Sequence, residues 1–136
     1  MSTALDVYAL TDEQVRDLTA IDDIEDLDAE PLTLSGFTNF EIEDLAQWLN
    51  VRATEGDPIV YDEDSGLVIF AWQPDFGEAL AKLSTDEIRD FADRLKQHEE
   101  LKDVERTTII DNLKKLSSFC VNSRNASLQI IQIAAF

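Results

Sequence analysis

Apolar residues recur at helical spacing in several stretches of the chain, and three of these stretches begin with the same pattern. A hydroxyl residue is followed three positions later by Gln or Glu, with apolar residues just before the hydroxyl and just after the pair. In such a capping box, each side chain bonds the backbone N–H of the other residue, and the apolar pair packs as a hydrophobic staple. We therefore expect helices to begin after Thr11, Thr38 and Ser84.

The predicted helices end where the apolar spacing stops. The charged segment 98–103 separates the last two long helices, because it interrupts the apolar face that runs on either side of it. The predicted helices cover about residues 12–21, 39–50, 85–97 and 104–121, with a short helical turn over 75–82.

The predicted strands are shorter than the predicted helices, and they differ in how apolar residues are distributed over their two faces. Apolar and polar residues alternate over 5–10, with Leu5, Val7 and Ala9 on one side of the predicted strand and Tyr8 and Leu10 on the other. Residues 67–73 and 127–136 are apolar on both faces, which predicts positions inside a sheet. The strand candidates are 5–10, the pair Leu32 and Leu34, 58–61, 67–73 and 127–136.

These elements predict a single α+β domain over residues 1–136, with a small, mostly antiparallel sheet of about four strands packed by four to five helices. A hydrophobic share of 44% in 136 residues supplies a core that can offset the entropy lost on folding. No apolar run approaches the ~18 residues that a membrane span needs. The first residues lack a signal-peptide pattern and the chain has one Cys, so a cytoplasmic location is expected.

Charge is divided unevenly along the chain. Residues 1–81 carry 20 Asp or Glu against only Arg16 and Arg52, whereas residues 82–136 carry nine acids and nine bases. Direct nucleic-acid binding and binding to an anionic membrane are not expected, because both require Lys and Arg. A basic protein would be attracted to the first part of the chain. The alternative is that the acids serve solubility or a salty habitat.

Two acidic segments are candidate sites for a basic partner. Segment 21–30 combines six acids with three large aliphatics, and it is either a docking strip or a hydrated loop whose aliphatics pack on the protein's own core. Segment 62–66 fits a hairpin turn, and it fails as an EF-hand calcium loop because Gly66 is its fifth residue and Gln73 its twelfth. The candidate partner-binding residues are Asp22, Asp23, Glu25, Asp26, Asp28, Glu30, Asp62, Glu63 and Asp64.

No catalytic residue, metal ligand or cofactor is predicted. His98 is the only histidine, and its cation would complement a helix end and neighbouring carboxylates. Cys120 lies among apolar residues, so we expect a buried thiol and not a nucleophile. The chain contains no glycine-rich phosphate loop, paired CxxC motif or GxSxG elbow.

In size, acidity and lack of catalytic motifs, the chain resembles the broad class of small acidic inhibitor and immunity proteins that neutralise basic toxins in bacteria. The resemblance implies a non-enzymatic binding protein with a basic partner such as a toxin or nuclease, or a DNA mimic that occupies a nucleic-acid-binding site. Trp48, Tyr61 and Trp72 are candidate anchors, although each also fits the core. Two other classes stay open: a ligand-binding domain or enzyme whose site is not visible in sequence, and a structural protein that forms homo-oligomers.

Overall fold

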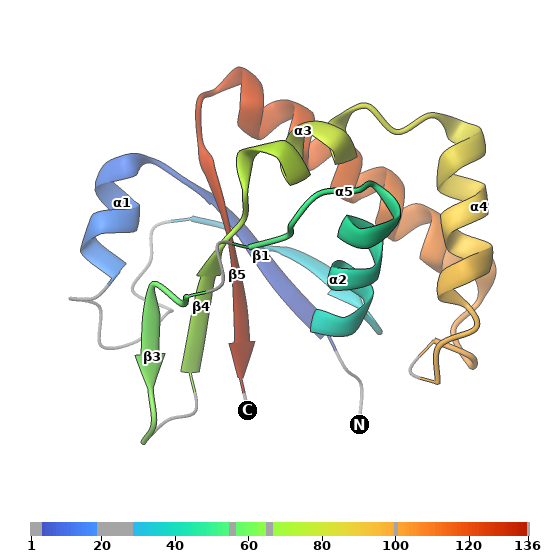
Figure 1. Ribbon diagram of the computed structural model, residues 1–136, viewed down its shortest axis with the longest axis horizontal. Helices are drawn as coiled ribbons and strands as arrows, with labels where there is room; N and C mark the ends of the chain where they lie inside the picture. The colour runs from blue at the N-terminus through green and yellow to red at the C-terminus, as the bar shows by residue number, and fades with distance from the viewer. Residues whose placement is uncertain (1–3, 19–28, 55–56, 65–66, 100, 136) are drawn as a thin grey trace.

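The structure, a computed structural model, describes residues 4–18, 29–54, 57–64, 67–99 and 101–135 (Figure 1). Strands and helices are interspersed along these residues, which confirms the predicted α+β class. The elements in chain order are β1 (Ala4–Leu10), α1 (Asp12–Asp17), β2 (Leu32–Ser35), α2 (Asn39–Trp48), β3 (Val60–Asp62), β4 (Leu67–Ala71), α3 (Pro74–Ala81), α4 (Thr85–Leu95), α5 (Arg106–Asn125) and β5 (Gln129–Ala135).

The strands form one five-stranded antiparallel sheet in the order β2-β1-β5-β4-β3. The C-terminal strand β5 lies in its middle, where Ile131 is opposite Tyr8 of β1 on one side and Ala71 of β4 on the other. This position explains why β5 is apolar on both faces, since Ile130 and Ile131 are both buried. The predicted interior position of this strand is therefore confirmed.

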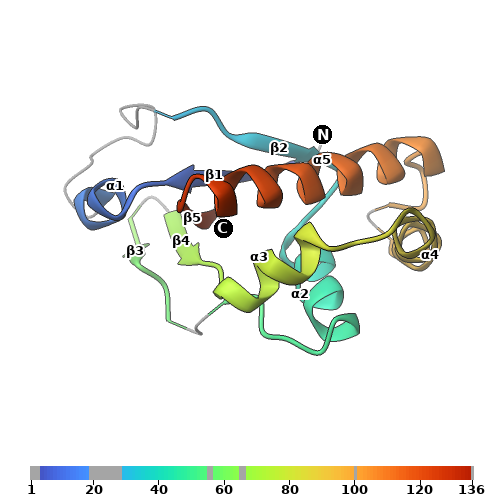
Figure 2. The same cartoon turned by 90° about the horizontal axis from the view of Figure 1, so that it is seen from above.

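Alternate residues of the strands belong to two apolar clusters on opposite faces of the sheet, because successive side chains of a strand point to opposite faces. Leu5 and Val7 face the larger cluster, to which α2, α3, α4 and α5 all contribute. Tyr8 and Leu10 face a smaller cluster that includes Leu18, just after α1. Figure 2 shows α1 at one end of the molecule and α4 at the other. Among the described residues, no helix combines the length and the apolarity needed to cross a membrane.

All three predicted capping boxes are present. At α4, the backbone N–H of Glu87 donates to Ser84 Oγ, and the backbone N–H of Ser84 donates to Glu87 Oε1, both at 3.1 Å. These bonds satisfy donors that the first turn of a helix otherwise leaves without partners. The local capping-box sequence thus determines where α1, α2 and α4 begin.

Most helix ends lie within two residues of the predicted ones, and two helix ends differ by more. α1 ends at Asp17 with Leu18 as its C-cap, and residues 19–21 of the predicted range lie outside the described residues. α5 continues past the predicted end at 121, because Ser123 is buried along the same face of the helix. The helix ends at Asn125, and beyond it Ser127 has φ 56°, while the N–H of Leu128 donates to the carbonyl of Ser123 at 2.8 Å. This is a Schellman ending formed without the usual glycine, which is why the sequence did not reveal it.

Ser84→Ala is expected to lower the free energy of unfolding by about 1 kcal/mol, because it removes the cap of α4. Chemical denaturation measures this loss. Ser118→Ala is the matched control, since Ser118 is an exposed residue inside α5 and Ala favours a helix. Equal stability of the two variants would contradict the role of the box.

Candidate functional site

The structure separates the acidic residues that the sequence proposed for partner binding. Glu63 and Asp64 are exposed in the turn between β3 and β4, directly after Asp62, the last residue of β3. Glu30 is exposed just before β2, which forms the opposite edge of the sheet. The remaining candidates lie outside the described residues; they are Asp22, Asp23, Glu25, Asp26 and Asp28. The β3–β4 turn is therefore the candidate acidic site that the structure defines best.

One of the three candidate anchors, Tyr61, is on the surface. Its side chain is 64% exposed, on β3 and one residue before the acidic turn begins. Trp72 is buried, and its Nε1 donates to Gln132 Oε1 at 2.9 Å. Trp48 packs against Phe91 with ring centroids 5.5 Å apart and lies under the guanidinium of Arg94. Trp72 therefore belongs to the core, and the half-buried Trp48 packs against it.

Tyr61 stands on an edge of the sheet. Within the described sheet β3 pairs only with β4, with Tyr61 opposite Val68, so the outer side of β3 leaves backbone groups without a strand partner. Such an edge can accept a strand from another molecule. The short length of β3 and the acids that follow it disfavour pairing with another copy of the same edge. An exposed aromatic ring, an open edge and exposed carboxylates are thus combined in five residues, 60–64.

The ion pairs of Lys and Arg in the described residues lie away from this edge. Among the described residues, the ion pairs that Lys and Arg form all use bases from residues 82–136; they are Lys82–Glu78, Arg94–Asp90, Lys102–Glu99, Arg106–Asp93 and Arg124–Glu78. α4 lies at the opposite end of the molecule from β3 (Figure 1). Three of these pairs use acids of residues 82–136, whereas Lys82 and Arg124 share Glu78 of the first part. None of the five pairs uses another acid of residues 1–81, so the acidic excess of the first part remains.

A second polar site, around His98, was missed by sequence reasoning. His98 Nδ1 lies 3.1 Å from Oε2 of the fully buried Glu41, and its Nε2 lies 2.7 Å from Asp44 Oδ2. Both contacts are hydrogen bonds when the imidazole carries two protons. Glu41 also accepts the N–H of Thr38 at 3.0 Å, as part of the capping box of α2. The sequence revealed the box, but not that a histidine 57 residues later would bind the same carboxylate.

His98, Glu41 and Asp44 form a cluster with a structural role, because their contacts connect α2 to the segment that follows α4. The ring connects two carboxylates of one helix, and the buried one has hydrogen bonds on both sides. A buried carboxylate needs such partners, because burying a charge without them is strongly unfavourable. Among the described residues, no group of three or more His, Cys, Asp or Glu side chains is arranged to hold a metal ion.

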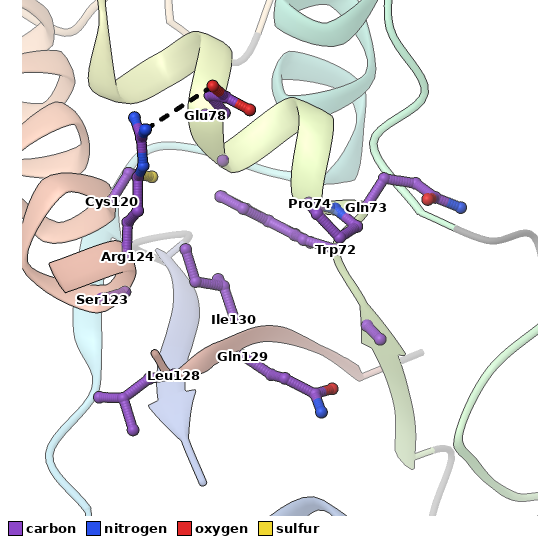
Figure 3. A pocket seen from close by; sticks show the side chains of 12 residues that line it. Trp72, Gln73, Pro74, Glu78, Cys120, Ser123, Arg124, Leu128, Gln129 and Ile130 are labelled. Atoms are coloured by element: carbon purple, nitrogen blue, oxygen red, sulfur yellow. Dashed lines mark ion pairs between the residues drawn. The ribbon is translucent and has the colours of Figure 1, made fainter. Parts of the chain in front are cut away.

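A pocket of about 510 Å³ lies between α3, the end of α5 and the start of β5 (Figure 3). Its apolar walls come from Trp72, Pro74, Cys120, Leu128 and Ile130. Polar groups are added by Gln73, Glu78, Ser123, Arg124 and Gln129. No sequence motif predicted this pocket, because its walls come from two segments that are more than forty residues apart in the sequence.

Cys120 lines this pocket as an inert thiol. It is buried, as the sequence predicted, and burial raises its pKa from the ordinary value of 9.0 to about 12. The group is therefore a neutral thiol near pH 7, and the nucleophilic thiolate is not formed there.

Comparisons of the chain with protein-family models, with curated proteins and with solved structures found no match. A function for the protein therefore has to be argued from its own residues.

His98→Ala is expected to lower the free energy of unfolding by about 2 kcal/mol, because hydrogen bonds to charged groups contribute about 1.5–3 kcal/mol. Gln97→Ala is the matched control, since Gln97 is the exposed neighbour of His98. Urea denaturation of both variants measures the difference. An equally small loss of unfolding free energy in both variants would contradict the structural role of His98.

The thiol of Cys120 should resist Ellman's reagent in the native protein at about pH 8, where a pKa of about 12 leaves it protonated. One thiol per chain should react once the protein is denatured. In addition, native stability should fall as the pH rises from about 9 toward 12, because the thiol of the unfolded chain ionises first. Cys120→Ala should remove that part of the pH dependence. Rapid reaction of the native thiol would contradict this description.

Proposed function

We propose that the protein is a non-enzymatic binding protein of the inhibitor or immunity kind, which neutralises a basic partner protein through the β3 edge. The observation that carries this proposal is Tyr61, an exposed aromatic side chain on an open sheet edge next to the exposed acids Glu63 and Asp64. The partner class includes toxins and nucleases, among them enzymes whose nucleic-acid site these carboxylates would occupy.

Each part of the edge would contribute differently to such a complex. Tyrosine is enriched among the few residues that dominate interface energies, and truncating such a residue typically costs 2 kcal/mol or more. The free backbone groups of β3 would pair with an extended segment of the partner. The acids of the turn would chiefly raise the association rate and select against acidic proteins. Tyr61 would therefore determine how long the complex lasts, and the carboxylates how fast it forms.

Charge distribution supports a basic partner over a neutral one. Residues 1–81 hold the whole net charge of −18, and the ion pairs of the second part engage bases that could otherwise offset it. Long-range attraction of this kind weakens as added salt shortens the screening length. A specific complex would survive higher salt through its buried contacts, whereas adventitious adsorption would not.

The proposal is tested by capture from a lysate of the source cells at ~50 mM and ~500 mM salt, read by mass spectrometry. Four tagged proteins are compared: the wild type, Tyr61→Ala, an edge pair (Glu63→Gln with Asp64→Asn) and a control pair (Asp103→Asn with Asp111→Asn). The control pair removes two exposed acids elsewhere, so both pairs have the same net charge. Thermal melts verify that all four are folded.

We expect one basic protein to be retained at low salt and partly at high salt, with its affinity reduced tenfold or more by Tyr61→Ala. The edge pair should slow its association, and the control pair should leave it unchanged. If the edge pair and the control pair slowed association equally, net charge alone would explain the attraction, and this would contradict a site at β3. Capture of nothing would contradict the proposal, as would a Tyr61-dependent homodimer detected by light scattering.

A further inference from the structure

The pocket beside α3 has the dimensions of a small-molecule site. Its volume of about 510 Å³ falls within the ~300–1,000 Å³ typical of ligand pockets. In Figure 3, Trp72 and Ile130 lie in the middle of the pocket lining, while Glu78 and Arg124 approach each other at one side of it. Apolar walls with a few polar groups at the opening are the usual composition of such sites.

Gly77 gives an independent reason to regard the pocket as more than a packing defect. It lies inside α3, where glycine costs about 0.5–1 kcal/mol relative to alanine, and it lines the pocket. Neither backbone nor packing requires it: a Cβ at this position would make an ordinary contact of 3.6 Å with Ile130 Cδ1. Gly36 differs, since it has φ 82° and a Cβ there would lie 3.0 Å from Leu101 Cδ2. At Gly77, a longer side chain would occupy the pocket, so the glycine keeps the space open.

The charged groups at the opening indicate the sign of the ligand. Glu78 Oε1 accepts a hydrogen bond from Lys82 Nζ at 3.0 Å, whereas Arg124 Nη2 is 3.9 Å from the same oxygen. Lys82 therefore holds the carboxylate of Glu78 and offsets its charge. The Arg124 side chain is 59% exposed at the end of α5, and its planar fork of N–H donors matches a carboxylate.

We propose that this pocket binds a small organic acid with an apolar body. The carboxylate of the ligand would pair with Arg124, and the body would pack against Trp72, Leu128 and Ile130. Polar Gln73 and Gln129 would border the entrance. This site is separate from the β3 edge, so it goes beyond the proposed partner binding and does not depend on it.

The test uses two probes of the same shape, 1-naphthaleneacetate and its neutral amide, in NMR titrations of the ¹⁵N-labelled protein. We expect the acid to shift the amide signals of Gly77 and Ile130 with a Kd of about 1 mM or tighter, as a probe of this size allows. The amide should bind at least tenfold more weakly. Equal binding of acid and amide would overturn the role assigned to Arg124, and no shift at these residues would overturn the site.

Three variants complete the test. Arg124→Gln should weaken binding of the acid at least tenfold, and the control Lys114→Gln, which removes an exposed base of the same helix, should not. Gly77→Leu should abolish binding by filling the pocket. Gly77→Ala should raise the melting temperature, because it improves the helix, while it weakens binding less than leucine does. Undiminished binding of the acid to Gly77→Leu would contradict the proposal. If Gly77→Leu fails to fold, the comparison of Arg124→Gln with Lys114→Gln still tests the proposal.

Discussion

The pairing of β5 with β1 on one side and β4 on the other is the interaction on which the rest of the structure depends. Without it, the sheet would be two separate hairpin-like pairs, β1 with β2 and β3 with β4. β5 also carries the buried Gln132, whose amide binds Trp72 and Asn39 and so positions the tryptophan and the start of α2. Because β5 is formed by residues 129–135 and pairs with β1, the sheet can close only when two segments far apart in the sequence meet, which has a high entropic cost of loop closure.

This sheet order places two different surfaces apart from each other. It leaves β3 at an outer edge, with Tyr61 and the acidic turn directed to solvent. It brings the start of β5 beneath α3 and the end of α5, where the pocket forms. The ion pairs agree with this division, since Arg94 and Arg106 pair with Asp90 and Asp93, whereas Arg124 lines the pocket, 3.9 Å from Glu78. We propose that the first surface binds a macromolecule and the second a small acid.

What the sequence predicted well is local in origin. A capping box depends on four consecutive residues, so the starts of α1, α2 and α4 were readable, and the two apolar faces of β5 placed that strand in the interior. What it could not predict depends on distant contacts. Glu41 and His98 meet only after α2 and α4 pack, and the pocket exists only once α3, α5 and β5 are assembled. Gly77 is unfavourable inside a short helix, but no pattern in the sequence connected this glycine with a pocket.

Zero-length cross-linking of the captured complex tests most directly the claim that the β3 edge is the binding surface. A carbodiimide joins carboxylates to lysine amines only where the two are in contact, and mass spectrometry of the peptides identifies both residues. The account predicts that lysines of the partner are joined to Glu63 or Asp64 in the β3–β4 turn. Links confined to the acids of α4 and α5, or a complex without any link to this turn, would contradict it.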